Sequence, residues 1–106
     1  MPSDTYPSDD DFQDLSTAHA SLADHGVKPG PQGYDVSTIA ALIYSNGWAY
    51  AIDRLGGNFR AEIRPGPGGL RSFHIVEMGW TADTAMVFAL AKALPHMAKP
   101  AVSGTP

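Results

Sequence analysis

The sequence contains no cysteine among its 106 residues. Disulfide bonds and thiolate zinc sites are therefore excluded, and with them the disulfide-stabilised scaffolds of small secreted domains. No apolar run approaches the roughly 18 residues that span a bilayer. The acidic N-terminus, MPSDTYPSDDD, lacks the basic and apolar regions of a signal peptide. We therefore expect a cytoplasmic protein that does not enter a membrane.

The residue patterns of common catalytic and cofactor sites are also missing. No G-x-S-x-G nucleophile turn occurs, and the glycine-rich segment 66–69 leads into a predicted strand, with no Gly-Lys-Ser/Thr after it. None of the histidines has the i, i+4 helical spacing that is typical of metal ligands, so a shared site would require the fold to bring two of them together. These histidines are His19, His25, His74 and His96. We therefore expect no enzyme, no metal and no cofactor.

Period-two alternation predicts a β-hairpin formed by residues 48–55 and 58–64. Large apolar residues alternate with small or charged ones in both segments, and Gly56-Gly57 supplies a two-residue loop that accepts positive φ. A shift of one residue would expose the apolar set of the second strand, so the pattern itself selects one register. The predicted pairs are Leu55 with Asn58, Arg54 with Phe59, Asp53 with Arg60, and Ile52 with Ala61.

A third strand and a helix are predicted after the hairpin. The segment Pro65–Gly69 predicts an irregular, mobile loop, and residues 71–78 predict a strand whose two faces are both partly covered. Thr81 is a typical N-cap, and Asp83 places a negative charge in the first turn of a helix over residues 81–94. Pro95 is expected to end this helix.

Residues 36–45 have two possible structures. Asp35 can cap a helix over this segment, and Asn46-Gly47 can end it. Asn-Gly between apolar segments is also a strong hairpin signal, which would make residues 38–45 a strand paired with the one that starts at Trp48. The capping Asp35 and the adjacent alanines Ala40 and Ala41 favour the helix.

The N-terminal third predicts an amphipathic helix over residues 9–25. Ser8 and Asp11 form a capping-box pattern, and His25-Gly26 is a typical helix end. The fold class is therefore α+β, with a three-stranded antiparallel sheet packed by helices 81–94 and 36–45 and preceded by helix 9–25. We divide the chain into an acidic arm with a Pro/Gly linker (1–34), an αβββα domain (35–97) and a disordered tail (98–106).

Charge is distributed unevenly along the chain. Residues 1–35 contain seven aspartates and one lysine, whereas residues 36–106 contain four acidic and six basic residues. An acid-rich arm of this kind is typically a solvated, solubilising segment. It could instead cover the arginines of the sheet, or imitate a nucleic-acid backbone for a partner.

Two sets of residues are candidates for binding. The first would contact a protein partner through an exposed aromatic residue, an amphipathic helix and its acidic first turn, namely Trp80, Phe12, Leu15, Asp9, Asp10 and Asp11. The second would contact nucleic-acid phosphates through an arginine-bearing sheet face, namely Arg54, Arg60, Arg64 and Arg71. Neutralisation of these arginines by Asp53, Glu62 and Glu77 is the simpler interpretation of the second set.

The α-β-β-β-α order over residues 36–94 resembles the topology of the double-stranded RNA-binding domain, which implies RNA binding. That family begins its second helix with lysines, whereas this chain has Thr81-Ala82-Asp83-Thr84. Residues 48–94, with Gly79, Thr81 and Ala85 as G-x-T-x-x-x-A, resemble the HicB-type antitoxin domain, although Thr84 replaces the glutamate usual there. In size and acidity the chain is also similar to phage-encoded inhibitors such as anti-CRISPR proteins.

The sequence thus favours a non-enzymatic protein-interaction module, and an inhibitor or antitoxin is its most concrete form. A nucleic-acid-binding domain that uses the arginines is the alternative. A protein partner and a possible homodimer are expected, but neither the partner nor the oligomeric state follows from the sequence.

Overall fold

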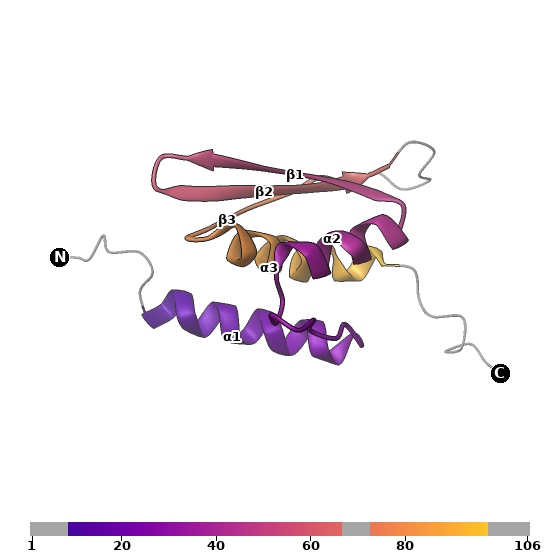
Figure 1. The fold of residues 1–106 in the computed structure, drawn as a ribbon, viewed down its shortest axis with the longest axis horizontal. Helices are drawn as coiled ribbons and strands as arrows, with labels where there is room; N and C mark the ends of the chain where they lie inside the picture. Colours follow the sequence, from indigo (N-terminus) through magenta and orange to yellow (C-terminus); the bar gives the residue numbers. More distant parts are fainter. Residues whose placement is uncertain (1–8, 67–72, 98–106) are drawn as a thin grey trace.

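A computed structural model describes residues 9–66 and 73–97 and shows three helices on one side of a three-stranded sheet (Figure 1). The sheet is antiparallel with strand order β1-β2-β3, which confirms the predicted α+β class. In chain order the elements are α1 (Asp9–Asp24), α2 (Val36–Ser45), β1 (Trp48–Leu55), β2 (Asn58–Pro65), β3 (Ile75–Gly79), α3 (Ala82–Ala93) and a 3-10 turn, Leu94–His96.

The register of the β1–β2 hairpin is the predicted one. Leu55 lies opposite Asn58, and the pairing continues to Trp48 opposite Pro65. Gly56 has a φ of +62°, a conformation that glycine adopts without steric cost. Ala61 and Ile63 of β2 are fully buried on the face that meets the helices. Alternation and loop length together therefore determined the pairing, as the sequence predicted.

Strand β3 is shorter than predicted. It starts at Ile75, although Phe73 and His74 are described and the prediction began at residue 71; residues 71 and 72 lie outside the described ranges. Continuing the β2–β3 register would place Phe73 opposite Pro65, which has no N–H to donate to a strand ladder. Phe73 instead packs its ring against Trp48, with 5.2 Å between the ring centroids.

Residues 36–45 form a helix, so the alternative in which residues 38–45 pair as a strand is wrong. Asp35 caps α2 by accepting a hydrogen bond from the Thr38 N–H at 2.9 Å. The next amide, that of Val36, donates to Asp83 Oδ1 at 2.9 Å, which ties the start of α2 to the start of α3. Asn46 closes the helix, so Asn46-Gly47 acts here as a helix end.

Helix α1 ends one residue before the prediction, in a Schellman motif. Gly26 has a φ of +83°, its N–H donates to the Ala23 carbonyl, and the Val27 N–H donates to the Leu22 carbonyl. Leu22 is fully buried in the same core as the sheet and α3. The proposed cap Ser8 and the predicted tail 98–106 lie outside the described residues.

Helix α3 is the central layer of the molecule. In Figure 1 the sheet lies on one side of it and α1 on the other, while α2 lies beside it under the sheet. A helix covered from two sides buries residues around most of its circumference, and α3 does so. Its buried residues are Thr84, Ala85, Met86, Val87, Ala89, Leu90 and Ala93.

The start of α3 sits directly on the end of β3. A Cβ atom on Gly79 would lie 2.5 Å from the Ala85 nitrogen and 2.8 Å from the Ala85 Cα. Thr81 caps the helix by accepting a hydrogen bond from the Thr84 N–H at 3.0 Å. Local packing thus explains the spacing of Gly79, Thr81 and Ala85. The backbone of α3 at Ala85 lies so close to β3 that residue 79 cannot carry a side chain, and Thr81 caps the helix between them.

Gly79→Ala should therefore destabilise the fold. The added methyl group forces β3 and α3 apart, at an expected cost of about 1–3 kcal/mol in the free energy of unfolding. Urea denaturation followed by circular dichroism measures this loss. Gly57→Ala is the control, because a Cβ there meets nothing within 4 Å and φ is not positive. An equal loss in both variants would contradict the close packing at Gly79.

The cap of α2 predicts a pH dependence of stability. The Thr38 N–H favours the charged form of Asp35 and lowers the pKa of this carboxyl below its usual value. A lowered folded-state pKa stabilises the fold above the unfolded pKa of about 4, and this contribution disappears as the pH falls through the folded pKa. Asp35→Asn keeps a capping oxygen but does not titrate. The variant should therefore lose less stability than the wild type between about pH 5 and pH 2 in thermal melts; parallel losses would contradict this assignment.

Candidate protein-docking groove

A groove of about 590 Å³ runs between α1, the edge strand β3 and α3. Pockets that bind ligands typically enclose roughly 300–1,000 Å³, so this one is large enough to hold part of a partner. α1 and β3 form its walls and α3 its floor. The lining residues are Asp11, Asp14, Thr17, Ala18 and Ser21 of α1, Val76, Glu77 and Met78 of β3, and Phe88, Ala91 and Lys92 of α3.

The α1 wall of the groove is formed by residues on one face of the helix. Asp11, Asp14, Ala18 and Ser21 recur every three or four residues and so share one face of the helix. The adjacent face carries Leu22, which anchors α1 in the core. Consequently α1 presents carboxylates at its N-terminal half and hydroxyls at its C-terminal half to the same groove.

The β3 wall is the edge of the sheet. Among the described residues β3 pairs only with β2, so its other side has no strand neighbour. Val76 is 44% exposed, an unusual setting for a large apolar residue in a strand. The next residue, Glu77, points toward α3, where the Lys92 Nζ lies 3.5 Å from its carboxylate. This wall therefore offers free backbone groups beside an exposed apolar side chain.

The groove is acidic. Its described lining includes three carboxylates, from Asp11, Asp14 and Glu77, and one ammonium, from Lys92. The Lys92–Glu77 pair is solvent-exposed on the lysine side, so it contributes little stability by itself. The excess of negative charge lies on α1, which contains five aspartates and no lysine or arginine.

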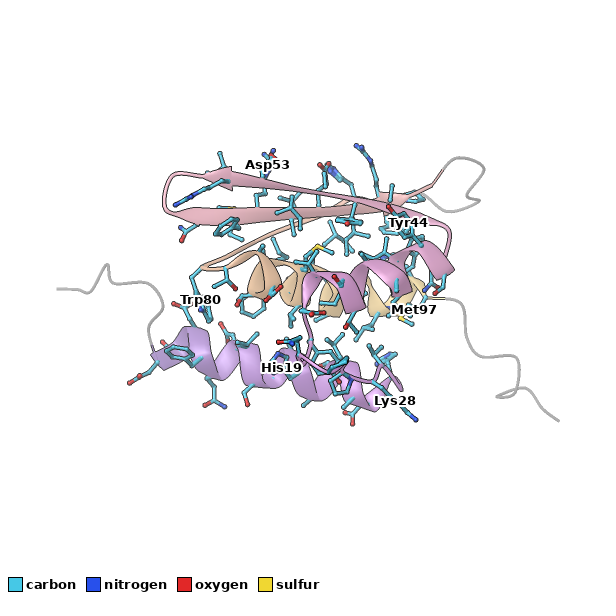
Figure 2. The ribbon with its side chains drawn as sticks, viewed as in Figure 1. His19, Lys28, Tyr44, Asp53, Trp80 and Met97 are labelled. Carbon is cyan, nitrogen blue, oxygen red and sulfur yellow. The ribbon has the colours of Figure 1, made fainter. Side chains whose placement is uncertain are left out.

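An aromatic cluster lies beside the groove. The ring centroid of Trp80 lies 5.4 Å from that of Phe12 and 6.1 Å from that of Phe88, both in edge-to-face geometry. Phe88 also lines the groove. Figure 2 shows Trp80 next to the N-terminal end of α1. Trp80, Phe12 and Phe88, called the aromatic cluster below, thus fasten the start of α1 to the start of α3.

The structure brings together part of the predicted protein-binding set. Phe12 and Trp80 contact each other, and Phe12 is 54% exposed. Asp11 lines the groove, whereas Asp9 and Asp10 are exposed in the first turn of α1 outside it. Leu15 is half-buried and packs against the core, so it holds α1 in place.

The predicted arginine set does not form one patch. Arg60 pairs with Asp53 on the open sheet face, and Arg64 lies 3.8 Å from Glu62 on the same face. Figure 2 shows Asp53 on the side of the sheet away from the helices. Arg54 belongs to the opposite face, where its guanidinium lies over the Phe59 ring at 5.5 Å from the centroid. Arg71 lies outside the described residues.

The histidines do not meet. His74 contacts Glu62 on the open sheet face, whereas the His96 ring stacks on Phe73 with 4.4 Å between centroids. Within residues 9–66 and 73–97 no three His, Cys, Asp or Glu side chains gather as a metal site would require.

Several groove residues were not predicted from the sequence. Asp14 follows Asp11 by three residues, so helical spacing could have added it to the acidic set. Val76, Phe88 and Lys92 carry no such signal, because the groove exists only once α1 lies across α3 next to β3.

In comparison with known proteins, the chain matches no family model, no curated protein and no solved structure. In the part of the chain that the structure describes, none of the helices has the length and apolarity needed to cross a membrane.

Contact between Phe12 and Trp80 predicts measurable coupling. In a double-mutant cycle with Phe12→Ala and Trp80→Ala, the coupling free energy obtained from the free energies of unfolding should be about 0.5–1.5 kcal/mol, as for other edge-to-face pairs. Phe12→Ala combined with Tyr44→Ala is the control, because Tyr44 lies at the other end of the molecule (Figure 2). Coupling no larger than in the control would show that Phe12 does not hold α1 through Trp80.

Proposed function

We propose that this chain is a non-enzymatic protein-interaction module that binds a protein partner in the groove between α1 and β3. The observation that carries the proposal is the edge of β3, which has no strand partner among the described residues and opens into this groove beside the exposed Val76. Edge strands of this kind are templates for pairing with another chain.

The chemistry of the groove supports binding more than catalysis. Among its described lining residues the hydroxyl groups belong to Thr17 and Ser21, and none is a histidine that could serve them as a general base. Of the three carboxylates in this lining, Asp14 is exposed on α1 and Glu77 of β3 pairs with Lys92, so they do not converge on one point as catalytic carboxyls do. The groove instead combines an apolar floor with a charged rim, as protein interfaces do.

An inhibitor or an antitoxin is the most concrete form of this function. Such a protein acts by covering a functional segment of its target, and a groove beside an edge strand can hold a segment in a fixed orientation. The acidic α1 would then add electrostatic attraction for the target and increase the rate of association.

Binding of nucleic acid is the alternative, and the open sheet face offers little support for it. The carboxylates of Asp53 and Glu62 lie next to Arg60 and Arg64 and offset their charge. Phosphate contacts require arginines or lysines with an excess of positive charge. The α1 wall and the sheet face thus both favour a protein partner.

Val76→Lys should abolish capture of the partner. The added charge blocks the edge of β3 without disturbing the core, because Val76 is 44% exposed. Leu55→Lys is a matched control, since Leu55 is 46% exposed at the hairpin end and does not line the groove. Affinity capture from a nuclease-treated lysate of the source cells, read by quantitative mass spectrometry, should show roughly a 10-fold or greater loss for Val76→Lys only.

Equal capture by Val76→Lys and wild type would refute the groove as the binding site. Recovery of nucleic acid alone when nuclease is omitted, with loss on combining Arg60→Glu and Arg64→Glu, would instead establish the alternative function. Circular dichroism of each variant separates a lost contact from a lost fold.

A further inference from the structure

Strand β3 can accept a fourth strand along its free edge. Within residues 9–66 and 73–97 its five residues pair only with β2, so every second residue turns its N–H and C=O toward the groove. An extended segment of about five residues, roughly 17 Å long, would match this edge. A helix placed there would leave these backbone groups without strand partners.

The register of β3 specifies two kinds of side chain for such a strand. Residues opposite Val76 and Met78 would share the open sheet face with them, where an apolar side chain covers the exposed Val76. The intervening residues would share the helix side with Glu77 and turn toward α1 and α3. An alternating segment is therefore required.

The negative charge of the groove indicates which side chains of the added strand would face α1. Asp11 and Asp14 line the α1 wall and Glu77 the opposite one, and α1 contains no lysine or arginine. Lysine or arginine side chains are long enough to rest on the apolar floor formed by Phe88 and Ala91 and to place their charge next to these carboxylates. Acidic side chains in the same positions would be repelled.

A second copy of this chain is a poorer occupant. Pairing of two β3 edges would bring together two acidic α1 helices, and the chain has a net charge of −4. Like charges placed opposite each other across an interface disfavour association.

On these grounds we infer that the groove takes an extended, cationic segment of a partner protein, which adds to β3 as a fourth strand with its basic side chains toward Asp11 and Asp14. The inference rests on the proposed function and specifies its ligand: an alternation of apolar and basic residues.

Direct binding of defined peptides to the full chain tests this inference. The probe is a capped, fluorescently labelled heptapeptide of alternating lysine and valine, measured by fluorescence anisotropy at low salt. Two peptides accompany it, one with glutamate in place of lysine and one with N-methyl groups on alternate backbone amides. The parent peptide should bind, and both companions should bind at least roughly 10-fold more weakly, since one lacks the charge and the other the strand pairing.

Charge reversal on α1 locates the peptide. Asp14→Lys should weaken binding of the parent peptide by roughly 10-fold or more, whereas Asp24→Lys should change it by less than about 2-fold. Both variants change the net charge equally on the same helix, but only Asp14 lines the groove. Hydrogen exchange should slow at the amides of β3 when the peptide is bound.

Each other result overturns the inference. Equal binding of the N-methylated peptide would exclude strand addition, and equal losses for Asp14→Lys and Asp24→Lys would exclude the α1 wall. A concentration-dependent dimer that Val76→Lys disrupts would assign the edge to a second copy. If the parent peptide fails to bind while capture of a protein still depends on Val76, the ligand chemistry is wrong and the proposed function stands; if capture does not depend on Val76, both fail.

Discussion

The close packing of α3 against the end of β3 is the constraint on which the rest of the structure depends. Gly79 has no room for a side chain. The small side chains of Ala85, Ala89 and Ala93, four residues apart on α3, allow neighbouring elements to come close to this helix. Small residues at this spacing let a helix lie close to a neighbouring element, where dispersion contacts are dense. Because α3 is covered from both sides, the sheet and α1 are held through one helix instead of through each other.

The groove is a consequence of this layering. α1 packs on α3 and does not cover the edge of β3. The groove therefore has a polar wall from α1, a wall from the edge of β3, and an apolar floor from α3. The aromatic cluster fixes the start of α1. A groove formed in this way lies between well-packed elements, and a preorganised site of this kind lowers the entropy cost of binding.

Charge is arranged so that the two faces of the molecule differ. On the open sheet face Arg60 pairs with Asp53, and Arg64 lies near Glu62, so positive and negative groups offset each other. On α1 there are five aspartates and no lysine or arginine. Within the predicted acidic arm, residues 1–34, α1 contributes Leu22 to the common core.

The sequence by itself determined the features that depend on neighbours a few residues away. Alternation around Gly56-Gly57 set the hairpin register, and Asp35, Thr81 and Gly26 marked helix ends through hydrogen bonds or positive φ within their own turn. Only the tertiary structure decided the start of β3 and the groove itself. The physical reason is that contacts such as Glu77–Lys92 and Phe12–Trp80 join distant parts of the chain, and their formation depends on how the layers pack as a whole.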